Sequence, residues 1–79
     1  MVKAQEIELI KYHWGRYIYK GGISTPLTED NIGCLSRGGI EHWASFLACA
    51  RRYLQEYPQD RNIIEGFIPK KLVKMLIGE

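Results

Sequence analysis

The sequence is poor in cysteine and has no long apolar run. It holds 79 residues but only two cysteines, Cys34 and Cys49, whereas a disulfide-stapled secreted domain of this size usually carries roughly four to eight. The start of the chain has no apolar segment of signal-peptide length, and no apolar run approaches the roughly 20 residues that span a bilayer. We therefore expect a cytoplasmic protein with two reduced thiols, with a Cys34–Cys49 bridge as the alternative, and no membrane contact.

Charge of one sign is also scarce. Eleven Lys and Arg residues oppose nine Asp and Glu residues, which leaves a net charge of +2. This bias is too weak to indicate nucleic acid or an anionic membrane as a partner. The content of 46% apolar and 25% charged residues is that of an ordinary globular chain. We expect one small helical domain over residues 1–79, which excludes a multidomain enzyme and a repeat array.

Two segments have the apolar spacing of long amphipathic helices. Residues 4–20 place several large apolar side chains within one arc before Gly21-Gly22 ends the pattern. Residues 40–57 carry a broader apolar face, and Pro58 ends that helix. The expected core residues are Ile7, Ile10, Trp14, Tyr17 and Ile18 in the first segment, and Ile40, Trp43, Phe46, Leu47, Ala50, Tyr53, Leu54 and Tyr57 in the second.

A short helix is expected between these two. Thr28 suits the N-cap of a helix over residues 29–37, in which Ile32 and Leu35 face inward. Gly38-Gly39 is expected to end it, because glycine often follows the last turn of a helix.

The C-terminal part of the chain is less uniform. A proline and a glycine bound a last helix, Lys70–Ile77. Residues 62–68 leave two alternatives, because Asp60 can cap a helical turn over Arg61–Glu65 but the isoleucine-rich sequence also suits a strand. The predicted fold class is all-α, a small single-domain bundle of three main helices plus one short helix.

Residues that could support catalysis or hold a metal are few and poorly spaced. His13, Cys34, His42 and Cys49 form no CxxC or HxxxH pattern, so we expect two surface histidines and no metal or other cofactor. His42 and Cys49 are about 10 Å apart along one helix, too far for a Cys–His nucleophile pair. The carboxylates are scattered, and we expect no enzymatic activity.

The most informative feature is a second stripe on the first helix. Leu9, Tyr12, Arg16 and Tyr19 follow helical spacing on nearly the opposite side from the expected core residues. Two tyrosines that flank an arginine beside a leucine have the composition of a protein–protein hot spot. The alternative is that the first helix is central in the bundle and buried on two sides.

A second feature is a group of basic residues. The residues are Arg51, Arg52, Lys70, Lys71 and Lys74, which form either a solvated face or a contact with phosphates or an acidic partner. A glycine pair before a long helix also has the outline of a helix-turn-helix. However, the first turns of that helix offer only His42 and Ser45 to read bases, and Glu41 repels phosphate.

One segment resembles a known family. Residues 7–17, which include Trp14-Gly15-Arg16-Tyr17, are followed by a Gly-Gly loop. They resemble the opening of phage antitermination proteins of the Q type, which begin with a helix ending in Trp-Gly-x-Trp; here the second tryptophan is Tyr17. The resemblance implies a small phage or mobile-element protein that acts on a host protein machine.

These observations favour a small, non-enzymatic helical module that binds a protein partner or a second copy of itself, as an adaptor or inhibitor. The alternative is a transcription-associated or DNA-binding factor that uses its basic residues.

Overall fold

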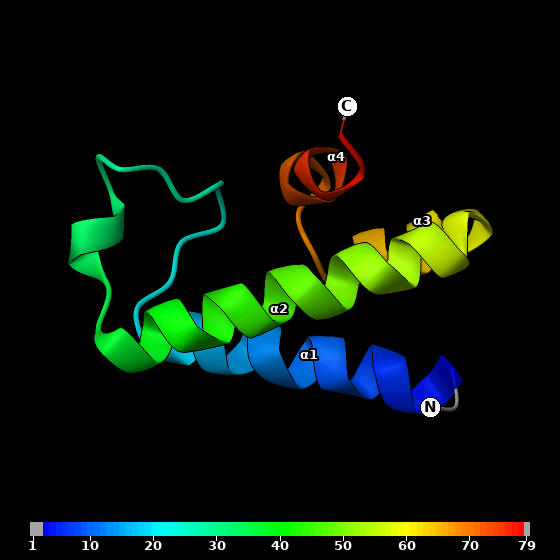
Figure 1. Cartoon of the computed structure of the whole chain (residues 1–79), viewed down its shortest axis with the longest axis horizontal. Coiled ribbons are helices and arrows are strands. Elements are labelled where there is room, and N and C mark those ends of the chain that lie inside the picture. Colours follow the sequence, from blue (N-terminus) through cyan, green and yellow to red (C-terminus); the bar gives the residue numbers. More distant parts are fainter. Residues whose placement is uncertain (1–2, 79) are drawn as a thin grey trace.

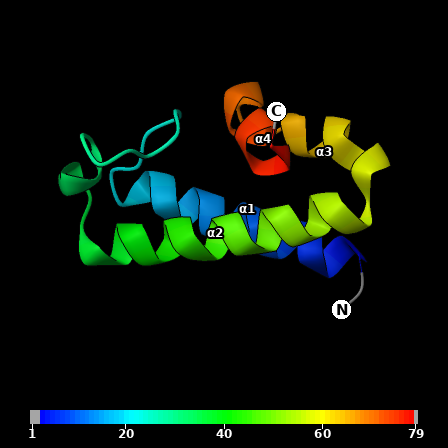
Figure 2. The same ribbon diagram turned by 45° about the horizontal axis from the view of Figure 1, so that its top comes forward.

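Two long helices form one layer of the protein. The computed structural model describes residues 3–78, apart from the side chain of Cys34. Helices α1 (Lys3–Tyr19) and α2 (Arg37–Glu56) run antiparallel, side by side (Figure 1). The loop that joins them and helices α3 (Arg61–Glu65) and α4 (Lys70–Ile77) lie on one side of this pair, and α4 runs across α2 (Figure 2). The all-α fold class is therefore confirmed.

The core lies between α1 and α2 and between this pair and helices α3 and α4. Trp43 of α2 packs its ring 4.9 Å from that of Tyr17 of α1, measured between centroids. The buried apolar residues are Ile10, Tyr17, Trp43, Phe46, Ala50, Tyr53, Leu54, Ile64, Ile68, Leu72, Val73 and Leu76. Most of the expected core residues are thus buried, and Ile7, Trp14, Leu47 and Tyr57 pack against them from the margin.

The prediction of burial is wrong for two of the expected core residues. Ile18 is 39% exposed and Ile40 is similarly exposed. Both residues lie at the edge of their apolar arcs. Because α4 packs on α2 and crosses it toward its C-terminal half, it leaves these edges in solvent (Figure 1).

The glycine pair after α1 ends the helix, as the sequence predicts. Gly21 has a φ of 91°, which an L side chain rarely adopts. Gly22 lies directly on the ring of Tyr17, where an added Cβ would be only 2.5 Å from the ring carbons. The Tyr17 hydroxyl accepts a hydrogen bond from the N–H of Ile23 at 3.0 Å. The loop therefore begins by closing over a buried tyrosine.

The short helix expected over residues 29–37 is wrong. This segment forms only a single 3-10 turn, η1 (Ile32–Cys34), and Ile32 is exposed. Thr28 does not cap a helix; its N–H donates to the Asn31 side chain and its carbonyl accepts from the turn that follows. Leu35 does pack against the core.

The second long helix begins three residues earlier than expected. Ser36 is its N-cap, and the Ser36 hydroxyl accepts a hydrogen bond from the N–H of Gly39 at 3.2 Å. Gly38-Gly39 therefore lies in the first turn of α2 instead of ending a helix. Gly39 is buried, and the side chains of Lys20 and Leu35 lie within van der Waals distance of the place that a Cβ would occupy.

The chain after Pro58 is helical. A 3-10 turn, η2 (Pro58–Asp60), leads into α3, and α4 follows Pro69 and ends at Gly78, which has a φ of 81°. The strand alternative for residues 62–68 is wrong, and residues 3–78 contain no strand. None of the helices in this range is long and apolar enough to cross a membrane.

Candidate functional site

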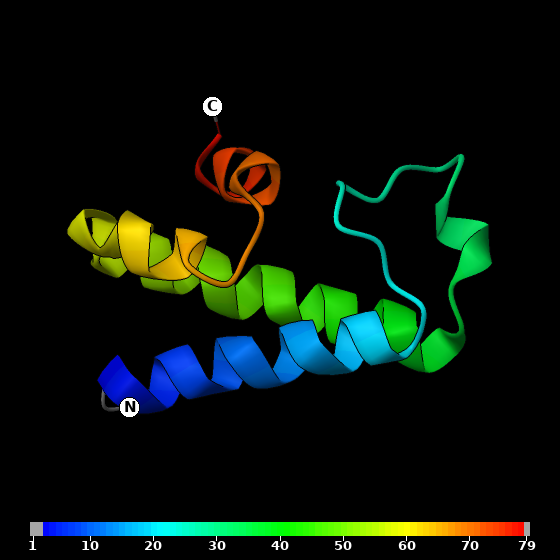
Figure 3. The ribbon, with the colours of Figure 1, turned by 180° about the vertical axis from the view of Figure 1, so that it is seen from behind.

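The four residues of the second stripe on α1, here called the outer stripe, lie on the side of the helix that faces away from the core. Tyr12 is 55% exposed and Tyr19 is 76% exposed; Arg16 is exposed and Leu9 is half-buried. Figure 3 shows α1 along the edge of the helix pair that is remote from α4. Within a single chain, the outer stripe is therefore a surface and not a second core face.

Both exposed tyrosines are held by neighbouring side chains. The guanidinium carbon of Arg16 lies 5.4 Å from the centroid of the Tyr19 ring, which is a cation–π contact. The Tyr12 ring meets the rings of His13 and His42 edge on, with centroid distances of 5.2 and 5.9 Å. Because His42 belongs to α2, the surface around the outer stripe extends over both long helices.

The two histidines form a pair that the sequence did not indicate. The Nδ1 atoms of His13 and His42 are 3.1 Å apart, and both side chains are half-buried. The expectation of two surface histidines did not include this contact. The residues are 29 positions apart, so only the antiparallel packing of α1 on α2 brings them together. Burial, and then the neighbouring His42, hold the pKa of His13 below its ordinary value of 6.5.

The expected basic residues do not act as one group. Arg52 turns toward α1, where its guanidinium lies 3.6 Å from a carboxylate oxygen of the buried Glu6. Arg51 turns toward α4 and lines a cavity beside Leu76. The α4 residues Lys70, Lys71 and Lys74 are exposed. The arginine pair is thus divided between two sides of α2.

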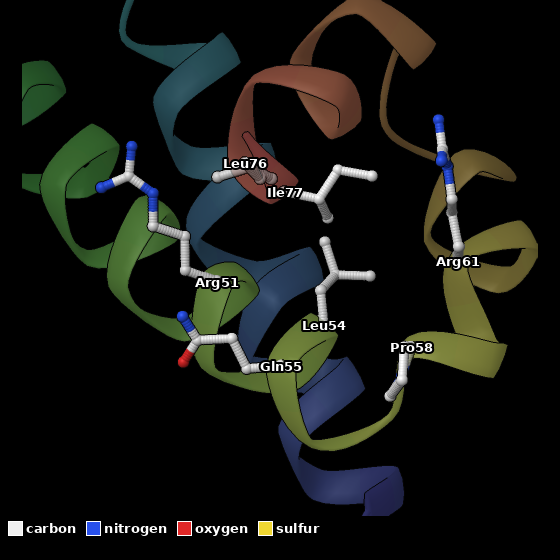
Figure 4. Close-up of a pocket in the computed structure, with 7 residues that line it drawn as sticks. All are labelled: Arg51, Leu54, Gln55, Pro58, Arg61, Leu76 and Ile77. Atoms are coloured by element: carbon white, nitrogen blue, oxygen red, sulfur yellow. The ribbon is translucent and has the colours of Figure 1, made fainter. Parts of the chain in front are cut away.

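The cavity beside Arg51 has a volume of about 420 Å³ and lies where α2, η2 and α4 meet. It is lined by Arg51, Leu54, Gln55, Pro58, Arg61, Leu76 and Ile77. In Figure 4 the two arginines stand on either side of Leu54 and Ile77. The Nε of Arg61 donates to Glu65 at 3.0 Å, and the C-terminal ends of α2 and α4 bring partial negative charge nearby. Glu65 therefore offsets the charge of one of the two arginines at the cavity.

A buried polar network ties the start of α1 to the end of α2. The hydroxyl of Tyr53 donates to Asp60 at 2.7 Å, and Lys3 forms an ion pair with the same carboxylate oxygen. Asp60 occupies the N-cap position of α3 but makes no capping hydrogen bond, because its carboxylate serves this network instead. The hydrogen bonds from Lys3 and Tyr53 hold the pKa of Asp60 below its ordinary value, and burial, followed by Asp60, raises the pKa of Tyr53. Neither group is therefore poised to transfer a proton near neutral pH.

No metal cluster is present in the part of the chain that the structure describes. It holds no group of three or more His, Cys, Asp and Glu side chains arranged to bind an ion. Cys49 is a half-buried free thiol, whereas the side chain of Cys34 lies outside the described residues, so the expected reduced pair stays a prediction.

Comparison with known proteins gives no relative. No protein-family model, characterised sequence or solved structure matches this chain. The resemblance of its opening helix to Q-type antitermination proteins therefore stays an expectation.

Proposed function

We propose that this protein is a small, non-enzymatic binding module that docks on a protein partner, or on a second copy of itself, through the outer stripe of α1. The main support is the exposure of Tyr12 and Tyr19, at 55% and 76%, on the side of α1 remote from the core. Exposed aromatic rings beside an arginine have the composition of binding hot spots, because they bury large apolar areas and still offer polar atoms.

The contacts of the two tyrosines support the same proposal. Tyr12 rests against the histidine pair, and Tyr19 lies beneath Arg16. Side chains that already rest on neighbouring groups lose less conformational entropy when a partner covers them. Truncation of either tyrosine is expected to weaken binding by about 1–3 kcal/mol.

Nucleic-acid binding is the second candidate function. Its support is the set of exposed lysines on α4, Lys70, Lys71 and Lys74, with Arg51 near the end of the same helix. Arg52, the fifth of the expected basic residues, does not join this surface, because it pairs with Glu6. A phosphate-binding surface must lose affinity steeply as salt rises, whereas docking through tyrosine rings depends on salt only weakly.

The experiment compares the parent chain with a Tyr12→Ala/Tyr19→Ala double variant and with Ile63→Ala as a matched control. Ile63 is also an exposed apolar residue, but it lies on α3, away from the outer stripe. Analytical ultracentrifugation measures self-association, and quantitative affinity capture from host lysate measures partner binding. We expect the double variant alone to lose its dimer or its specific partner. Equal association of all three chains would overturn the proposal.

A further inference from the structure

The contact between His13 and His42 has the geometry of a single shared proton. The ring centroids are 5.4 Å apart, which is about the 3.1 Å between the Nδ1 atoms plus one ring radius at each end. The rings therefore meet end on, as in an N–H···N hydrogen bond. Such a bond needs one Nδ1 that carries hydrogen and one that has a free lone pair.

The number of protons on the pair decides whether the bond exists. With both rings neutral, or with one protonated, one Nδ1 can donate and the other can accept. With both rings protonated, every ring nitrogen carries hydrogen and no acceptor is left. Two cations would then face each other at hydrogen-bond distance, in a half-buried position between α1 and α2.

The surroundings of the pair do not favour a second positive charge. On α1, the neighbours are Tyr12, whose ring edge meets both histidines, and the cation Arg16 one turn further along. The charged end of the Lys20 side chain lies toward Gly38, one turn before His42. On α2, Glu41 is next to His42 in the sequence, but its carboxylate forms an ion pair with Arg37 at 3.5 Å. Among residues 3–78, neither histidine has a recorded ion pair with a carboxylate.

We propose that His13 and His42 form a proton-sensitive clasp that fixes α1 to α2 beneath Tyr12 and makes the outer stripe dependent on pH. Above the titration range the shared hydrogen bond holds the two helices together and supports the Tyr12 ring. Protonation of both imidazoles breaks the bond and pushes the rings apart. The effect on partner binding rests on the proposed function; the clasp itself does not.

The sign of the pH effect follows from the lowered pKa of His13. The unfolded chain takes up protons near pH 6.5, whereas folded His13 resists protonation because of burial and His42. The stabilising contribution of the clasp is thus fully present above pH 6.5 and is lost as pH falls through the lower, folded value. Any affinity that depends on the position of Tyr12 declines over the same range.

The clasp is tested on the full chain without a partner. NMR follows the Hε1 signals of both histidines from about pH 8 to about pH 5, in the parent and in His42→Ala. We expect a His13 midpoint below 6.5 in the parent and an upward shift in the variant, because the neighbouring imidazole is gone. An unchanged His13 midpoint would overturn the clasp.

A second experiment uses a variant that can keep the hydrogen bond but has no imidazole to take up a proton. Asparagine can replace each imidazole as donor or acceptor without binding a proton in this range. The double variant His13→Asn/His42→Asn is therefore expected to keep its melting temperature over the interval in which that of the parent falls. Equal losses in both chains would contradict the clasp. If the clasp fails while Tyr12→Ala/Tyr19→Ala still abolishes association, the proposed function stands without it.

Discussion

Tyr17 and Tyr19 are two residues apart on the same helix and have opposite surroundings. Tyr17 is completely buried, its ring packs on Trp43 and Gly22, and its hydroxyl accepts a hydrogen bond from the loop. Tyr19 is 76% exposed, and its recorded ring contact is with Arg16. The same side chain thus serves the fold on the inner face of α1 and remains available on the outer face.

The difference between the two faces shows which residues the fold uses. On the inner face, aromatic rings are fixed by packing, and the Lys3–Asp60–Tyr53 network pairs the polar groups at one end of the core. On the outer face, the tyrosines rest on polar and titratable neighbours that remain in contact with solvent. Changes on the inner face should therefore act on stability, whereas changes on the outer face should act on binding.

The largest expected effect is on the inner face. Trp43→Ala removes the ring that packs against Tyr17 and Phe46 and should destabilise the fold by about 3–5 kcal/mol, because it leaves a cavity between α1 and α2. In a domain of this size such a loss approaches the whole free energy of unfolding. Urea unfolding followed by circular dichroism measures it, with Ile40→Ala as the control on the exposed edge of the same helix. Similar losses in both variants would mean that the faces of α2 are assigned wrongly.

The polar end of the inner face should respond next. Tyr53→Phe keeps the buried ring but removes the hydrogen bond to Asp60, and we expect a loss of about 1.5–3 kcal/mol at neutral pH. Because the folded pKa of Asp60 lies below 3.8, the stability that this network adds is present above that value and is lost as pH falls through the folded one.

Unfolding curves at neutral and acidic pH check this prediction. The difference between Tyr53→Phe and the parent should shrink in acid. Tyr57→Phe is the matched control, because it keeps the ring beneath Lys3 and changes no recorded hydrogen bond among residues 3–78. A loss of stability that is equally large at both pH values would contradict a role for the ionised carboxylate.

Alanine substitutions of two glycines, one on α1 and one in the loop after it, should change the stability by smaller amounts and with opposite signs. Gly22→Ala places a Cβ at 2.5 Å from the ring of the buried Tyr17 and should cost about 1–3 kcal/mol by overpacking. Gly15→Ala adds a methyl group with no neighbour within 4 Å and should stabilise the helix by about 0.5–1 kcal/mol. Thermal melts of the two variants test both signs, and destabilisation by Gly15→Ala would show that the outer face is packed.

The sequence predicts those parts of the fold that depend on local spacing. The helix expected over residues 4–20 spans Lys3–Tyr19, and the expected last helix has the bounds Lys70–Ile77. In both, apolar residues repeat with the helical period and glycine follows the last turn, so the local pattern and the tertiary packing agree. The outer stripe could be found for the same reason, although its exposure depends on where α4 packs.

The segment before α2 could not be predicted in this way. Its glycine pair has the usual composition of a helix end, but Ser36 caps the helix and both glycines lie in the first turn of α2. The expected helix over 29–37 depended on that stop. Once α2 begins at Arg37, only residues 29–35 remain between Thr28 and the Ser36 cap, and within them a single 3-10 turn forms.

Contacts between residues far apart in the chain also could not be predicted from the sequence. His13 meets His42 because α1 and α2 are antiparallel with a particular register, which no local spacing encodes. The separation of Arg51 from Arg52 has the same origin, since neighbours on a helix point about 100° apart and α1 and α4 flank α2 on different sides.

The most direct test of this account is the stability of the Tyr12→Ala/Tyr19→Ala double variant, measured by urea unfolding beside Trp43→Ala. If the outer stripe is a surface kept for a partner, the double variant should fold and lose less than about 1 kcal/mol for each tyrosine, while Trp43→Ala unfolds. A loss in the double variant as large as that of Trp43→Ala would mean that the outer face belongs to the core, and would contradict its proposed role in binding.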